Sequence, residues 1–355
     1  MKTLNLLLLS IMLFVNCSSV SKESDIHQDN TKPVDFTGKL LLSNDQGNTW
    51  ASLDTYISKD MNIISLFAEG ETLSLGSENG LIHNIDLESP KMATTENVMT
   101  VVINKNPVKE NWVSEIFTLS SGHYTHVYGE GLFRKDSGSA LWQPITIPEG
   151  IHGISKMTED TQRNIYLACQ YGVYKTMDQC KTWNRVFTLG FANDIIFHNE
   201  TLWIVGNHGI HQSNDQGKTW SNVSNVQNML DWHNNDSNSI RIFENENKLF
   251  ILKRNVENSM MQADSGCALI FSDDNGKTWK HHELDKYLKS QNGVRNVFFQ
   301  QGKYYYTTKN ALMKSEDQGV SWKYILNVPD TENNMSFRVL IAGDKLIVSK
   351  ENFGC

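Results

Sequence analysis

The octet SDDNGKTW, from Ser272 to Trp279, places two aspartates, an asparagine and a glycine within eight residues. Such a composition occurs in cation-binding loops, because side-chain oxygens are the ligands that calcium prefers. An EF-hand loop that begins at Asp273, however, needs a bidentate glutamate at its last position, where this chain has Leu284. A metal site is therefore not expected, and the octet needs a different explanation.

The octet recurs along the chain. Further copies begin at Ser43 (SNDQGNTW), Thr176 (TMDQCKTW), Ser213 (SNDQGKTW) and Ser315 (SEDQGVSW), and a degenerate copy, KDSGSALW, occupies residues 135–142. The aspartate suits a turn because it accepts backbone N–H groups, the glycine permits a positive φ, and the tryptophan packs between neighbouring units. The residues expected to have this structural role are Asp45, Trp50, Asp178, Trp183, Asp215, Trp220, Asp274, Trp279, Asp317 and Trp322.

Each copy lies at the same place in a longer unit, which is clearest in residues 191–223. This segment predicts four short strands separated by turn residues, at 194–197, 202–205, 210–213 and 219–223. The unit recurs from about residues 112, 151, 238 and 293, and a unit without the octet begins near residue 61. Four-stranded units repeated at this spacing are typical of the blades of a β-propeller.

The two ends of the chain complement each other. GKLLLSNDQGNTWASL, from Gly38 to Leu53, contains only the third and fourth strands of a unit, and SFRVLIAGDKLIVSKENFG, from Ser336 to Gly354, contains only the first and second. Joining them protects edges that an open ring would expose. We therefore predict an all-β fold, a seven-bladed β-propeller of four-stranded blades, whose ring closes when the N-terminal strands complete the C-terminal blade.

The pattern S-x-D-x-G-x-T-W resembles the Asp-box of the bacterial neuraminidase repeat proteins. That superfamily includes the sialidases and seven-bladed proteins similar to the photosystem II assembly factors. The resemblance covers nearly the whole chain after its N-terminal segment. It implies that each octet forms the hairpin turn between the third and fourth strands of a blade, so all the copies receive a structural interpretation.

The N-terminal residues have a separate character. Lys2 precedes an apolar run over residues 4–15 that is too short to span a bilayer, and Cys17 follows it. The ending LFVNC resembles a bacterial lipoprotein signal, which implies palmitate-type acylation of Cys17; an ordinary secretory signal cut further along is the alternative. The expected division of the chain is a signal peptide over residues 1–16, a flexible tether over 17–33 and the propeller over 34–355.

The localisation expected from this signal is export, as a bacterial lipoprotein in the outer membrane or facing the periplasm. The net charge of -8, with 40 acidic and 32 basic residues, argues against nucleic acid or an anionic membrane surface as the main partner. No cofactor or metal is expected, because the sequence has no CxxC motif and no Cys/His cluster. Disulfides remain open, since spacing selects no pairing among Cys169, Cys180, Cys267 and Cys355.

Candidate binding residues lie on the face opposite the octets. The longest connections, residues 231–238, 254–266 and 328–334, belong to one sector of the ring, and uneven loops on a rigid scaffold often bind ligands. Trp232 is the tryptophan in these loops that we expect to be exposed. The alternative is that these loops merely vary in length.

Three of the 7 arginines are expected near the start of consecutive inner strands: Arg241, Arg295 and Arg338. Guanidinium groups that converge in this way suit a carboxylate or phosphate. The corresponding positions on other blades are expected to hold Ser65, Glu115, His152 and Asp194. The alternatives are that the acidic residues balance the arginines internally, or that the strand register is different.

Two classes of function remain open. The resemblance to sialidases implies glycoside hydrolysis, but the F/Y-R-I-P sequence and a Tyr/Glu pair are missing, so only Glu115 and Asp194 are weak catalytic candidates. The resemblance to the photosystem II assembly factors implies a non-enzymatic scaffold that binds a protein in the cell envelope. We favour this scaffold, a monomeric assembly factor or periplasmic inhibitor of the immunity type, with glycan binding or a sialidase-like hydrolase as the alternative.

Overall fold

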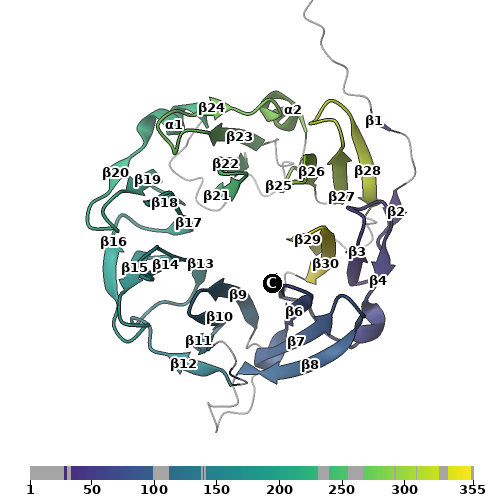
Figure 1. Cartoon of the computed structure of the whole chain (residues 1–355), viewed down its shortest axis with the longest axis horizontal. Helices are drawn as coiled ribbons and strands as arrows, with labels where there is room; N and C mark the ends of the chain where they lie inside the picture. Colours follow the sequence, from purple (N-terminus) through teal and green to yellow (C-terminus); the bar gives the residue numbers. More distant parts are fainter. Residues whose placement is uncertain are drawn as a thin grey trace, which may run out of the picture.

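The computed structural model describes residues 28–29, 33–98, 112–136, 139, 141–230, 240–254, 267–291, 293–308, 310–327 and 335–352. Seven antiparallel four-stranded units form a closed ring around a central opening (Figure 1). The predicted seven-bladed β-propeller is confirmed. In the segment chosen above as the clearest unit, the four predicted strands are all present.

The blades are numbered from the one that contains both ends of the ring. Blade 1 consists of β29 (Met335–Ala342), β30 (Lys345–Asn352), β3 (Leu40–Ser43) and β4 (Ala51–Ser52). Blade 2 consists of β5 (Ser65–Glu69), β6 (Thr72–Gly76), β7 (Leu81–Asp86) and β8 (Lys91–Asn97). Blade 3 consists of β9 (Val113–Leu119), β10 (Gly122–Val127), β11 (Gly131–Lys135) and β12 (Gln143–Ile145).

The remaining blades follow the same order from the channel outward. Blade 4 consists of β13 (Ile154–Glu159), β14 (Ile165–Cys169), β15 (Gly172–Thr176) and β16 (Asn184–Phe187). Blade 5 consists of β17 (Ala192–His198), β18 (Thr201–Gly206), β19 (Gly209–Ser213) and β20 (Ser221–Asn222). Blade 6 consists of β21 (Ile240–Asn245), β22 (Lys248–Arg254), β23 (Cys267–Ser272) and β24 (Lys280–His281). Blade 7 consists of β25 (Asn296–Gln300), β26 (Lys303–Thr307), β27 (Ala311–Ser315) and β28 (Trp322–Asn327).

Ring closure occurs as the sequence predicts. β3 pairs antiparallel with β30, with Leu41 opposite Val348 and Leu42 opposite Ile347. All residues of β3 are buried, because neighbouring blades cover both faces of this strand. Two short strands, β1 (Gln28–Asp29) and β2 (Val34–Asp35), pair in parallel with the outer strand β28. β1 lies within the segment expected to be a tether, so part of that segment runs along blade 7.

The octets form turns between the third and fourth strands. In blade 6, Asp274 Oδ1 accepts the Thr278 N–H at 2.8 Å and Asp274 Oδ2 accepts the Thr278 hydroxyl at 2.6 Å. The Ser272 hydroxyl donates to Asp274 Oδ1 at 2.9 Å and accepts the Gly276 N–H at 2.7 Å. Equivalent bonds to the aspartate form in the other four turns, at Asp45, Asp178, Asp215 and Asp317. The acidic side chain of the octet therefore organises its own turn.

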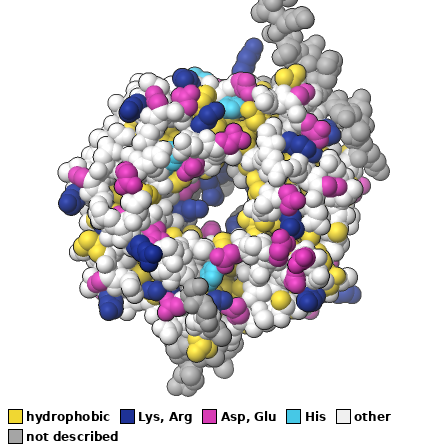
Figure 2. All heavy atoms as spheres, viewed as in Figure 1, with side chains coloured by type: hydrophobic (Ala, Val, Ile, Leu, Met, Phe, Trp, Pro, Cys, Tyr) yellow, Lys and Arg dark blue, Asp and Glu magenta, His cyan; other side chains and the backbone are white. Residues whose placement is uncertain are grey.

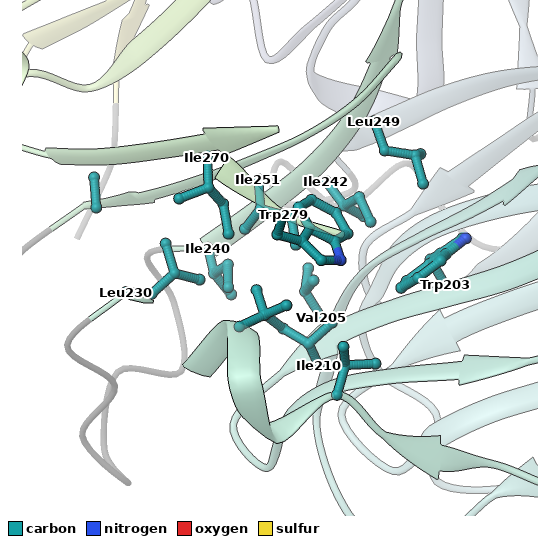
Figure 3. Close-up of a cluster of buried hydrophobic side chains, with 13 residues drawn as sticks. Trp203, Val205, Ile210, Leu230, Ile240, Ile242, Leu249, Ile251, Ile270 and Trp279 are labelled. Atoms are coloured by element: carbon teal, nitrogen blue, oxygen red, sulfur yellow. The ribbon is translucent and has the colours of Figure 1, made fainter. Parts of the chain in front are cut away.

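The tryptophans pack between blades. Trp279 is buried in a hydrophobic cluster between blades 5 and 6, where its ring meets Trp203 edge to face at 5.7 Å (Figure 3). Trp220 donates its indole N–H to the carbonyl of Val186 in the preceding blade at 2.8 Å. In the degenerate copy, Trp142 is buried and donates to Glu96 of blade 2 at 2.7 Å. Packing of this kind holds the blades in contact.

Helical turns occupy some connections between strands: η1 (Asp54–Tyr56), η2 (Glu78–Gly80), α1 (Ser224–Met229) and α2 (Asp285–Ser290). No helix in the described ranges has the length and apolar character needed to cross a bilayer. Cys169, Cys180 and Cys267 are buried free thiols, whereas Cys17 and Cys355 lie outside the described residues. Within the part of the chain that the structure describes, no His/Cys/Asp/Glu group has the arrangement of a metal site.

Candidate functional site

In each blade, counting back along the first strand from the turn that joins it to the second strand gives one equivalent position. We call its occupants the register set: Ser65, Glu115, Lys156, Asp194, Arg241, Asn296 and Arg338. Arg241 and Arg338 thus hold equivalent places. Arg295 precedes the set by one residue, and because neighbouring residues of extended chain point to opposite sides, it does not join them.

The register set differs from expectation in blade 4. His152 lies before β13 and is exposed. Lys156 holds the position that the sequence analysis expected for His152. A β-bulge precedes Glu115, Lys156 and Asp194 alike, but blade 4 alone has a longer first connection, residues 160–164, where the other inner hairpins have two-residue turns. The number of residues between strands therefore misplaced the channel residue of blade 4, which is basic.

Charges of both signs from the register set influence one another across the channel. Burial raises the pKa of Glu115, and the positive charges of Arg338, Arg241 and Lys156 oppose this rise. Figure 2 shows basic and acidic side chains around the central opening. The five charged members of the set therefore share one electrostatic environment.

Asp194 has a structural role within this environment. One carboxylate oxygen accepts the Ile195 N–H at 3.0 Å, and the other accepts the Ile242 N–H of blade 6 at 3.2 Å. Its side chain is buried, and this burial raises the pKa of Asp194 against the charges of Lys156 and Arg241. Asp194 therefore links the inner strands of blades 5 and 6.

Two basic members of the set, Arg241 and Lys156, are less constrained. Arg241 and Lys156 are exposed, and neither forms a hydrogen bond or salt bridge with the residues that the structure describes. Arg338 is half-buried, as is Arg295, whose Nε lies buried without a hydrogen-bond partner in the described ranges. Trp232 and most of the long loops named above lie outside the described residues. The channel thus presents cationic groups that an anionic group could contact.

Exposed apolar side chains lie on the same face, in a sector that the sequence did not single out. Tyr128, between β10 and β11, is 55% exposed and stacks on Trp112 with ring centroids 6.3 Å apart. Tyr171, between β14 and β15, is 43% exposed, and Leu189, between β16 and β17, is 53% exposed. These connections lie opposite the octet turns, because they join second to third and fourth to first strands. Tyrosines held on short turns are suitable contacts for a protein partner.

Comparisons with known proteins identify the fold. No family model matches the chain, and no curated protein matches it. A solved structure described as "YCF48 bound to D1 peptide" aligns with a TM-score of 0.53 and 12% sequence identity, covering 93% of this chain and 99% of that chain. The Neurospora crassa Pan2 WD40 domain aligns with a TM-score of 0.52 and 9% identity, covering 83% of this chain and 90% of that one. At these identities the alignments show that the chain shares the propeller fold of both.

Proposed function

We propose that this propeller is a non-enzymatic scaffold that binds a segment of a protein partner at the channel face opposite the octet turns. The observation that carries the proposal is the set of basic side chains at the channel, in which the charges of exposed Arg241 and Lys156 and of half-buried Arg338 all act on the acidic Glu115. A carboxylate of the partner, from an acidic side chain or a chain end, would complete the charge pattern there.

The aromatic side chains extend the same surface. Tyr128, Trp112 and Tyr171 would bury apolar area of the partner, while the arginines would orient its charged group. The likeness to YCF48, which has been solved with a D1 peptide, supports a peptide as the bound element. The octet pattern, which resembles the Asp-box, supports the same comparison.

The channel carboxylates favour binding over hydrolysis. Glycoside hydrolysis requires two carboxyl groups that face the sugar, one to donate a proton and the other to attack or to activate water. Both oxygens of Asp194 already accept backbone N–H groups, and its side chain is buried. Of the two carboxylates in the register set, only Glu115 is then left for catalysis, whereas the reaction requires two.

The location we propose is the bacterial cell envelope, with the protein anchored through an acylated Cys17. The support is the N-terminal sequence, which resembles a lipoprotein signal. Metabolic labelling with palmitate tests this proposal. Label should be incorporated into the full chain and lost in Cys17→Ala, and equal labelling of the two proteins would refute the anchor. In this setting the scaffold would act as an assembly factor or as an inhibitor of the immunity type.

Partner binding is tested by crosslinking in envelopes, identification of the crosslinked segment, and titration of the purified chain with that segment as a synthetic peptide. We expect the double variant Arg241→Ala, Arg338→Ala to weaken binding by about 10- to 100-fold, because truncating central charged contacts is costly. Arg163→Ala is the matched control, since this exposed arginine lies in a hairpin on the face of the octet turns. Unchanged affinity of the double variant would refute the proposed site.

A further inference from the structure

A cavity of about 460 Å³ opens between blades 6 and 7, on the face that carries the octet turns. Its volume lies within the range of small-molecule sites. It is formed by rings at its base and polar groups at its edge: Asn245, Glu246, Lys248, Phe250, Phe271, Lys280, His281, His282, Glu283, Phe299, Gly302, Tyr304 and Gln318. The channel and the aromatic face described above lie on the opposite side of the propeller.

Phe271, which lines this cavity, is a ring at a position that is basic or polar in three of the other octet blades and is Leu42 in blade 1. It immediately precedes the octet of blade 6, where the corresponding octets of blades 4, 5 and 7 are preceded by Lys175, Gln212 and Lys314. In blade 4 this side chain covers a ring, with Lys175 Nζ 5.4 Å from the Tyr166 centroid. In blade 6 a second ring replaces the cation, and Phe271 stacks on Phe250 with centroids 5.9 Å apart.

The equivalent groove between blades 2 and 3 is filled differently. Its cavity is only about 150 Å³. Asn84 and Glu96 occupy the places that Phe271 and His282 have in the larger cavity. Glu96 accepts hydrogen bonds from Lys135 at 2.8 Å and from Asn84 at 2.9 Å, in addition to that from Trp142. This polar network satisfies its own members, whereas the groove between blades 6 and 7 is left aromatic and open.

The rings of the larger cavity are only partly covered. Phe271, Phe299, Tyr304 and His282 are half-buried, above a buried Phe250. Phe299 meets Tyr304 edge to face at 4.8 Å, and His282 lies 5.4 Å from Phe299. Half-exposed rings that meet around one concave space resemble the lining of a ligand site more than the core of a blade.

The polar edge of the cavity carries balanced charges. Lys248 and Lys280 place their ammonium groups 5.8 and 5.9 Å from the centroid of Phe271. Glu246 and Glu283 supply carboxylates at the same edge, and Glu283 accepts the Tyr304 hydroxyl at 3.3 Å. Lys280 also forms a salt bridge with Asp273 at 3.1 Å. Lysines and carboxylates therefore lie together at this edge, where the lysines oppose a cationic ligand and the carboxylates oppose an anion. The site is therefore suited to a neutral ligand with many hydroxyl groups.

We propose that this cavity binds the pyranose ring of a neutral sugar. A pyranose has an apolar C–H face, which suits the rings of Phe271 and Phe299, and hydroxyl groups at its edge, which can donate to Glu246 and Glu283 and accept from Lys248. The hydroxyl groups of a neutral sugar can donate to the carboxylates and accept from the ammonium groups at the same time, which an aliphatic ligand cannot do. This proposal does not depend on partner binding at the channel.

The test is titration of the purified chain with neutral sugars, monitored by calorimetry and by saturation-transfer NMR. Glucose, galactose, mannose, N-acetylglucosamine and short β-linked oligomers of each form the panel. We expect saturable binding of at least one of them, with Phe271→Lys weakening it by about tenfold or more. Phe271→Lys installs the residue type that blades 4 and 7 have at this place, so folding is expected to persist.

The matched control is Gln212→Lys, which installs lysine at the same position of blade 5 and should leave sugar affinity unchanged. Tyr304→Phe, which removes only the hydroxyl contact to Glu283, should weaken binding by a smaller factor. The proposal is overturned if no sugar in the panel binds saturably, or if Phe271→Lys binds as well as the unmodified chain. Tighter binding of a tryptophan-containing dipeptide than of every sugar would also overturn it, and would identify an anchor for a protein side chain.

Discussion

Gly276, in the octet turn of blade 6, should not tolerate a methyl group. Its φ is +76°, and a Cβ atom added there would lie 2.1 Å from Cη2 and 2.2 Å from Cζ2 of Trp203 in blade 5. Trp203 is fully buried against Trp279, so its ring has little room to move. Gly276→Ala therefore combines a backbone penalty with a steric clash between two blades.

The two costs can be separated. A left-handed backbone costs an L-residue about 1 kcal/mol, and overpacking a core costs about 1–3 kcal/mol, so Gly276→Ala should lower the free energy of unfolding by about 2–4 kcal/mol. Gly343→Ala is the control, because Gly343 has a φ of +61° and no atom within 4 Å of an added Cβ. That variant should lose only the backbone part, about 1 kcal/mol.

Urea unfolding followed by tryptophan fluorescence and by circular dichroism measures both variants. If Gly276→Ala and Gly343→Ala differ by less than about 0.5 kcal/mol, the clash between blades is refuted. A double-mutant cycle gives a second check, since Trp203→Leu removes the ring atoms that the added methyl group meets. In the Trp203→Leu background, the cost of Gly276→Ala should fall to about 1 kcal/mol. An unchanged cost would place the strain elsewhere in the turn.

Three further predictions concern polar groups. The Thr278 hydroxyl and N–H hold the pKa of Asp274 at about 2, below its ordinary value of 3.8, so this carboxylate stabilises the fold above pH 4 and the contribution is lost as the pH falls through 2. Melting temperatures between pH 5 and 2 should therefore fall less steeply in Asp274→Asn, and parallel curves would contradict this. Glu96→Gln should lower the free energy of unfolding by about 1–3 kcal/mol, because Lys135 and Trp142 lose a charged acceptor; a urea titration that shows no loss would contradict it. Burial raises the pKa of the thiols, to about 11 for Cys180, so a thiol reagent at pH 8 should label the folded chain at none of Cys169, Cys180 and Cys267, whereas urea should expose all of them.

The fold was predictable because its information is repeated. The octet marks the third turn in several blades, and the incomplete units at the two ends fix both the blade number and the mode of closure. The role of Asp274 was also predictable, since an aspartate two residues after a serine has few geometries in which it can satisfy a tight turn. Repetition of this kind compensates for the weak signal of each short strand.

The channel residues were harder to predict. A β-bulge shifts the register of an inner strand by one residue, and a shift of one residue exchanges the side chain that faces the channel. Lys156 was missed because the longer connection of blade 4, residues 160–164, changes the count from the following strand, and Arg295 lies one residue away from the position that the other two arginines share. The bulged residues Ser114 and Asn193 carry no side-chain signal that marks them as bulges.

The aromatic cavity had a visible signal in the sequence. Aligning the octets shows Phe271 where Lys175 and Lys314 precede the copies in blades 4 and 7. That the phenylalanine remains half-exposed, however, depends on the rings that blade 7 contributes, Phe299 and Tyr304. Residues that meet between blades are far apart in the sequence, so a local sequence pattern does not predict their contacts.

Closure of the ring by β3 and β30 also determines the order in which this molecule can fold. The apolar strand Leu40–Ser43 is synthesised before its partner Lys345–Asn352, and all the other blades lie between them in the chain. Until then its backbone N–H and C=O groups remain unpaired, and the entropy of closing so long a loop must be lost before this pairing stabilises anything. We therefore expect the pairing of β3 with β30 to be a slow step of folding, and the unpaired strand to be most open to aggregation before that step.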